Sequence, residues 1–172
     1  AGNIDSAVAT TSSSNNRFKS GMINLNLRHT ISSSQDITAD IDCLNYNIKG
    51  EQEFNNALVA SGGYNEASRG NIPTGIKIIS GKIDHTLRLK KSTTIQSGWK
   101  SSHIATDNTA DYQKFDGSIW SIDYGKSNHF LYKENILGAY INLSKSLKKF
   151  DFNAGVRMEN TNVSGTTLDS LV

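Results

Sequence analysis

A strict alternation of apolar and other residues between Lys126 and Thr161 constrains this chain more than any other feature. Leu137, Ala139, Ile141 and Leu143 are apolar, and small, polar or amphipathic residues separate them. After a basic turn at 145–149, the alternation resumes with the apolar residues Phe150, Phe152, Ala154, Val156 and Met158. A period of two is that of a β-strand with one apolar and one polar face. The stretch therefore predicts a hairpin of two long strands.

The rest of the chain repeats this plan. Alternation predicts further strands at about 17–31, 37–48, 74–89 and 93–104. In the second of these, the apolar positions change parity between Cys43 and Leu44, which indicates either a β-bulge or a strand that leaves its apolar environment. We therefore predict an all-β fold, an antiparallel meander of about six long strands.

The connections between these strands alternate in length. Short turns join the first and second, third and fourth, and fifth and sixth strands, whereas long loops are expected at about 49–73 and 105–129. In an antiparallel meander all the short turns then lie at one end, as in outer-membrane barrels. We expect a lead-in or loop at 1–16, a barrel segment at 17–165 and a tail or loop at 166–172.

Six strands are too few to close a membrane barrel, whose minimum is about eight. We therefore expect a partial segment of a transmembrane β-barrel, with two open edges. The chain opens with the polar stretch AGNIDSAVATTSSSNN, which has no apolar signal-peptide core. Either the mature protein is cytosolic or the sequence is an internal piece of a longer chain, and the barrel interpretation favours the second.

Composition is compatible with a barrel. The hydrophobic content is 36%, and the sequence lacks the run of about 20 apolar residues that a membrane-spanning helix needs. Barrel strands escape such a search because every second residue is polar. The net charge is +2 with no basic stripe, so we expect no nucleic-acid partner. The single cysteine, Cys43, cannot form an internal disulfide.

No motif points to catalysis or to a bound metal. His29, His85, His103 and His129 are scattered without the close spacing of metal ligands. The sequence also lacks a nucleophile elbow and a phosphate loop. We predict a protein that is not an enzyme, with no catalytic residue, no cofactor and no metal site.

The residue order of the last predicted hairpin resembles a known family. It opens with FLYKENI at 130–136, continues with Ala-Tyr-Ile-Asn at 139–142 and exits with Gly-Val-Arg-Met-Glu-Asn-Thr at 155–161. This order is similar to the barrel of Bacteroidetes-type TonB-dependent outer-membrane receptors. The segments at 97–108 (SGWKSSHIATDN) and 24–46 resemble earlier parts of the same barrel, so the resemblance covers about residues 15–165.

The resemblance implies a barrel of about twenty-two strands with a plug in its lumen, located in the outer membrane and energised through TonB. This chain would supply wall and loops of a receptor for a scarce nutrient: a siderophore, cobalamin or a glycan. Its partners would be outer-membrane lipid, the rest of the barrel and the plug. TonB would be reached only through an N-terminal part absent from this sequence, and the isolated segment is expected to self-associate.

If Leu137 to Leu143 face lipid, the opposite face lines the lumen. The residues expected there, in contact with the wall, a ligand or the plug, are Tyr132, Glu134, Tyr140, Asn142, Arg157 and Glu159. Aromatic residues expected in interfacial girdles, or alternatively in a core, are Trp99, Trp120, Phe130, Tyr132, Phe150 and Phe152. The alternative from another class is a soluble extracellular β-sandwich or small barrel that binds carbohydrate or protein.

Overall fold

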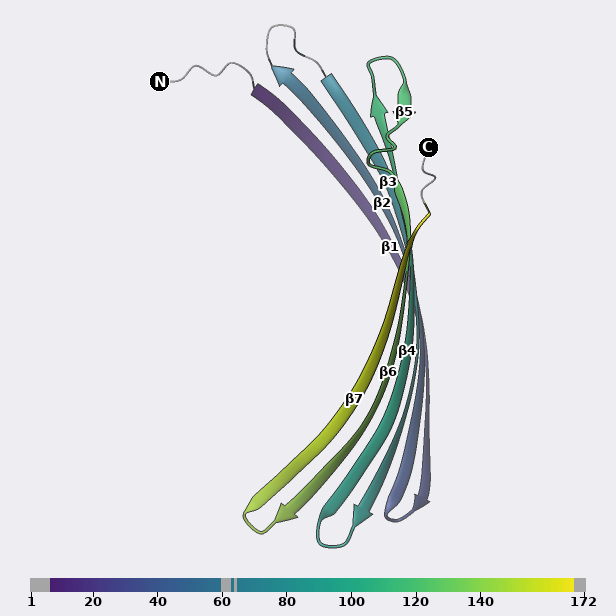
Figure 1. Cartoon of the computed structure of the whole chain (residues 1–172), viewed down its shortest axis with the longest axis vertical. Helices are drawn as coiled ribbons and strands as arrows, with labels where there is room; N and C mark the ends of the chain where they lie inside the picture. Colours follow the sequence, from purple (N-terminus) through teal and green to yellow (C-terminus); the bar gives the residue numbers. More distant parts are fainter. Residues whose placement is uncertain (1–6, 60–62, 64, 169–172) are drawn as a thin grey trace, which may run out of the picture.

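The computed structural model describes residues 7–59, 63 and 65–168 as one curved antiparallel sheet (Figure 1). Its strands are β1 (Ala7–Ser32), β2 (Gln35–Val59), β3 (Asn65–Leu89), β4 (Thr93–Phe115), β5 (Trp120–Ile122), β6 (Asn128–Leu147) and β7 (Phe150–Thr167). The order across the sheet is β1-β2-β3-β4-β6-β7, and the short β5 pairs only with β4. The predicted all-β meander is therefore confirmed, with seven strands instead of six. No helix in the described part is long and apolar enough to cross a membrane.

The strands are longer than predicted, and the prediction of long loops at 49–73 and 105–129 is wrong. Most of 49–73 forms the paired ends of β2 and β3, and 105–115 is the end of β4. The signal was missed because these strand ends lack one-sided apolar alternation. Pro73 sits within β3, and the β3–β4 ladder skips Ile72 and Pro73, as expected where an N–H donor is missing.

The chain ends and the turns also differ from the prediction. The lead-in expected at 1–16 is strand from Ala7 onward, and the tail expected at 166–172 is strand up to Thr167. The remaining residues of both segments, apart from Leu168, lie outside the described part. The turn expected at 145–149 is tighter, because β6 runs to Leu147 and β7 starts at Phe150.

The change of parity in β2 does not come from a β-bulge. Both ladders of β2 keep an unbroken register through Cys43 and Leu44, and the β1–β2 register shifts only between Thr30 and Ser32. The bulge interpretation is therefore wrong. The second interpretation is left: the strand keeps its geometry while the surroundings of its two faces change.

Directly opposed residues share one face of a sheet, so the register assigns every side chain to a face. One row across the sheet consists of Leu27, Ala39, Ile83, Trp99, Ala139 and Met158. Similar rows build an apolar band, from Ile79 to Leu89 on β3 and from Leu137 to Leu147 on β6. Such a segment rises about 33 Å along the strand, and a tilt of about 40° reduces its height to about 25 Å, that of a barrel's apolar band.

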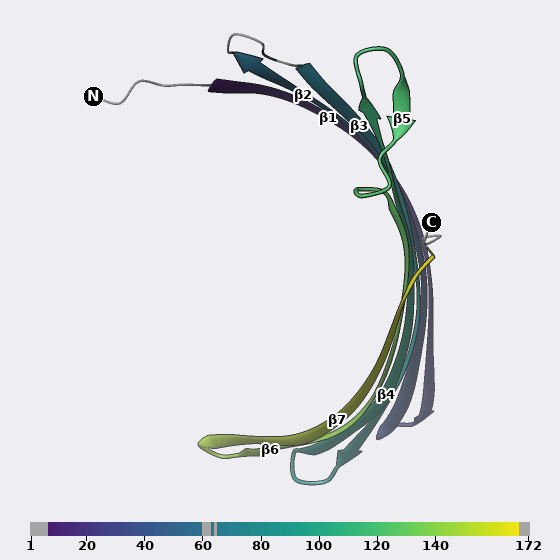
Figure 2. The ribbon, with the colours of Figure 1, turned by 45° about the horizontal axis from the view of Figure 1, so that its top comes forward.

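The band is on the outside of the curve. Along β2, residues 42, 44, 46 and 48 of the face opposite the band are half-buried, whereas residues 41, 43, 45 and 47 of the face that carries the band are exposed. Side chains converge on the inside of a curved sheet, so the polar face is concave and the apolar face convex; the curvature is clear in Figure 2. No apolar side chain of the described residues is buried, and Ile41 is 50% exposed. The described chain thus has a lipid-type outer surface instead of a core.

Candidate functional site

The six residues expected to face the lumen all lie on the concave face. Tyr140 is directly opposite Arg157 on β7, Asn142 is opposite Gly155, and Glu159 is opposite Gly138. Tyr132 and Glu134 follow on β6 with the same parity as Tyr140. The structure therefore brings them to one surface, although whether they contact a ligand or a plug stays a prediction.

Tyr140 reaches across a neighbouring strand. Its ring lies over Gly98 of β4, where an added Cβ would be only 2.5 Å from the ring atom Cε1. Its hydroxyl donates a hydrogen bond to Asp84 Oδ1 on β3 at 2.5 Å, and Lys82 forms an ion pair with the same carboxylate. Asp84 Oδ1 lies at least as close to that place as the ring does, so the glycine is required because a side chain would displace both the ring and the carboxylate.

The same arrangement recurs farther along the sheet. Tyr112 of β4 lies over Gly70 of β3, again with 2.5 Å between an added Cβ and Cε1. Its hydroxyl donates to Gln52 Oε1 on β2 at 3.0 Å. Each tyrosine thus joins strands that are not neighbours and covers the intervening glycine, a device that fixes strand register.

Asp36, near the turn between β1 and β2, is the most covered polar residue of the described chain, with 6% exposed. Its carboxylate accepts hydrogen bonds from Arg28 of β1 at 3.5 Å and from Arg88 of β3 at 2.5 Å. The Arg88 backbone N–H also donates to Ser34 of the turn at 2.7 Å. Three strands are therefore tied together around one carboxylate at the turn end of the concave face.

The two charged residues predicted on β7 pair with each other. Arg157 Nε donates to Glu159 Oε2 at 3.1 Å, and a second guanidinium nitrogen contacts the same oxygen. Tyr132 donates in the same way to Glu134 on its own strand, at 2.9 Å. These contacts agree with charge and hydrogen-bond pairing along a polar wall. They also leave these groups accessible on the concave surface.

Sequence reasoning missed the acidic side of this network. Asp36 was assigned to no site, and the residues Lys82, Asp84 and Arg88 were not singled out. On β3 the parity of Lys82, Asp84 and Arg88 is opposite to that of the apolar residues Ile79 and Ile83. On β2 the parity of Asp36 is opposite to that of Ile41, and these alternations were the available signal. The contacts between these residues depend on the register between strands, and alternation does not specify that register.

The predicted aromatic girdles are only partly on the lipid-type face. Phe150 and Phe152 lie on the convex face at the turn end, with ring centroids 6.5 Å apart, and Trp99 lies within the apolar band. Phe130 and Tyr132 lie on the concave face and face away from the band. Trp120 of β5 packs on Phe115 at 5.3 Å and under the Arg69 guanidinium at 4.3 Å.

The loop between β4 and β5 is held by a carboxylate outside the apolar band. Asp116 Oδ1 accepts hydrogen bonds from the backbone N–H groups of Ser118 and Ile119, each at 2.9 Å. These donors, that of Ile119 first, hold the pKa of Asp116 below its ordinary value. Gly117 supplies the positive φ of 98° that this loop needs.

Comparison with known proteins assigns the chain at the level of a family. A family model described as the outer membrane protein beta-barrel family matches residues 9–171. No curated protein matches the chain.

Similar solved structures include the ferric citrate transporter FecA in its unliganded form, with 8% identity over 78% of this chain and 22% of that chain, and a TM-score of 0.42. BauA, the ferric preacinetobactin receptor from Acinetobacter baumannii, has 15% identity over 94% of this chain and 26% of that one, with a TM-score of 0.45. FyuA, the ferric yersiniabactin uptake receptor from Yersinia pestis, has 10% identity over 87% and 34%, with a TM-score of 0.38. The chain thus spans about a fifth to a third of these structures.

Proposed function

Because the chain belongs to the outer membrane protein beta-barrel family, it is an outer-membrane protein, and we propose that it forms part of the barrel of a TonB-dependent receptor of the Bacteroidetes kind. In this proposal the chain supplies wall to an uptake receptor and has no catalytic role. The finer assignment rests on the residue order of the last hairpin, FLYKENI at 130–136 through Thr161, which resembles that receptor family.

The observation that carries the barrel role is the division of one sheet into two faces. The convex face exposes Ile41, Ile83 and Ile141, at 50%, 49% and 54%, as a surface that faces lipid does. The concave face is polar and hydrogen-bonded at the same height, through Asp84, Tyr140 and their neighbours. Lipid on one side and a polar lumen on the other account for both.

The concave network suits a wall that faces a plug. The ion pairs of Lys82, Arg88 and Arg157 run along or between neighbouring strands, so these charges are compensated within the wall before any partner arrives. Arg157 is still 63% exposed at its side chain, so it is available to contact a plug or a ligand. The cargo would be a scarce nutrient, such as a siderophore, cobalamin or a glycan.

The soluble binding module is not favoured by this structure. A sandwich needs two packed sheets with apolar side chains between them, whereas the described residues form a single sheet with no buried apolar side chain. A small closed barrel would join β1 to β7, and these strands are the two edges of the described sheet.

The full-length protein in its own cells tests the receptor proposal. Cells that carry the gene should take up one of the candidate ligands (ferric siderophores, cobalamin or glycans) faster than cells without it. A protonophore that discharges the inner membrane should abolish the difference, because TonB-linked uptake needs that energy. In planar bilayers the purified protein should stay closed because a plug fills its lumen. Steady open conductance combined with protonophore-insensitive uptake would refute the proposal and indicate a passive pore.

A further inference from the structure

A group of basic residues lies on the convex face directly beyond the apolar band, on the side away from the short turns. The group, which we call the basic collar, consists of Arg17, Lys19, Lys49, Lys77 and Lys133. Lys77 is two residues before Ile79, where the band starts on β3, and it shares a row with Lys133 through Ala105. The collar is therefore continuous with the lipid-facing surface.

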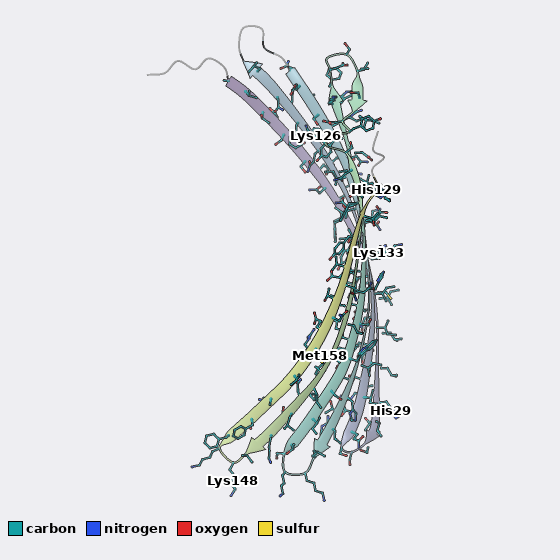
Figure 3. All side chains as sticks on the ribbon, in the orientation of Figure 1. His29, Lys126, His129, Lys133, Lys148 and Met158 are labelled. Atoms are coloured by element: carbon teal, nitrogen blue, oxygen red, sulfur yellow. The ribbon has the colours of Figure 1, made fainter. Side chains whose placement is uncertain are left out.

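Three collar lysines line a groove in this face. The groove has a volume of about 510 Å³, and its lining includes Lys49, Lys77 and Lys133. Gly75 lies between them, and nothing is within 4 Å of the place where its Cβ would be. Pro73 and Leu131 add apolar lining. In Figure 3, Lys133 is labelled midway along the sheet, far from Lys148 in the turn between β6 and β7.

The groove has excess positive charge. Lys49, Lys77 and Lys133 form no ion pair with other residues of the described chain, and all three are exposed. The acidic residue that lines the groove is Asp107, and its Oδ1 is 2.8 Å from Nε2 of His129. The carboxylate is therefore already engaged, while the three ammonium groups are available.

We propose that this groove binds the phosphate groups of lipid headgroups in the outer leaflet. In outer-membrane barrels the short turns are periplasmic, so the opposite end of the band, where the collar lies, is at the level of the outer leaflet's headgroups. Clustered lysines at that depth attract anionic lipids, and an ammonium group is a common phosphate ligand. The acyl chains of a lipid held there would lie on the apolar band below, beside Ile79. The assignment needs the outer-membrane location alone and is independent of any cargo.

The turn end supplies a matched control. Lys91, Lys148 and Lys149 carry the same charge but project from turns or turn boundaries between strands. The test variant changes Lys49, Lys77 and Lys133 to Gln, and the control changes Lys91, Lys148 and Lys149 to Gln. A third variant, Gly75→Leu, keeps every lysine and fills the groove.

The measurement is retention of phosphatidic acid by the full-length protein, taken from phosphatidylcholine vesicles that contain it and quantified by native mass spectrometry. At about fivefold for each lysine, the test variant should weaken apparent affinity about a hundredfold. Gly75→Leu should also weaken it, and the control should retain wild-type affinity. The urea midpoint of each variant is measured in parallel. Because the three lysines have no ion pair to lose, the test variant should fold normally. If it does not, Gly75→Leu, which keeps all three lysines, tests the groove in its place.

Three results would overturn the proposal. Equal retention by wild type and both groove variants would show that the groove does not bind phosphate lipid. An equal loss in the turn control would show a response to total charge instead of a site. Binding of inorganic phosphate as tight as that of phosphatidic acid would show a small-anion site without a role for the rest of the lipid.

Discussion

Replacing Ile83 by arginine tests the assignment of the two faces. Ile83 lies in the middle of the apolar segment of β3, opposite Ala39 and Trp99, and its side chain is 49% exposed. If this exposed half contacts lipid, an arginine there costs about 2–4 kcal/mol of folding free energy. That is about a 30- to 1,000-fold shift of the folding equilibrium.

Two arginine variants isolate face and depth. Ser102→Arg introduces the same charge on the concave face of the adjacent β4, opposite Ser80 and Ile136, and should change stability by about 0.5 kcal/mol. Asn47→Arg lies on the convex face but beyond the band, opposite Lys19 and Gly75, and should cost at most about 1 kcal/mol.

The assay is urea unfolding of the barrel that contains this chain, in phosphatidylcholine vesicles, with tryptophan fluorescence from Trp99 and Trp120 as the signal. The expected order of destabilisation is Ile83→Arg, then Asn47→Arg, then Ser102→Arg. If Ser102→Arg costs as much as Ile83→Arg, the concave face is not the lumen, and the orientation of the sheet in the barrel wall is wrong.

Four further outcomes follow from the same geometry. Asp36→Ala leaves two arginines without their shared acceptor and should cost about 1–3 kcal/mol in the urea assay; an unchanged midpoint would contradict the role of Asp36 as a three-strand tie. Gly98→Ala should cost about 1–3 kcal/mol by overpacking against the Tyr140 ring and Asp84 Oδ1, which both lie against the place of the new Cβ. Combining it with Tyr140→Ala should remove the part of that cost that comes from the ring. The carboxyl of Asp116, followed by NMR, should titrate below 3.8. Because folding lowers the pKa of this carboxyl, its contribution to loop stability is full above pH 3.8 and is lost as the pH falls through the lower folded pKa. A titration midpoint at or above 3.8 would contradict this prediction. The isolated chain, which exposes the edges β1 and β7, should form oligomers that detergent dissociates, and light scattering from a monomer indifferent to detergent would count against this.

The apolar face was predictable because alternation records which solvent each face meets. The runs at Leu137–Leu143 and Phe150–Met158 specified both strand type and the face of Tyr140, Asn142 and Arg157. Lipid on one side and water on the other impose a period of two on any strand between them. The prediction therefore succeeded where a strand crosses between these solvents.

The contacts of the site were not predictable from the same signal. Tyr140 meets Asp84 because Gly98 separates them in one row of three strands, and that row depends on how two turns set the register. A shift of two residues would keep every residue on its face and change its partners. Alternation thus specifies the face of a residue, whereas contacts need the relative position of strands.

The missed strand ends show a further property of this sheet: its faces exchange character at one height. Below that height the apolar residues of β2 and β3 are convex, as with Ile41 and Ile79; above it they are concave, as with Tyr46 and Ile76, which are directly opposed. On β1, Phe18 joins the concave group, with its ring 5.7 Å from that of Tyr46. The convex face becomes basic over the same rows. No register shift accompanies the exchange in β2, so we infer that the exchange reflects a change of surroundings. The lipid outside the wall would end at this height. In the receptor that we propose, the plug and the facing wall would cover the apolar inner surface above this height.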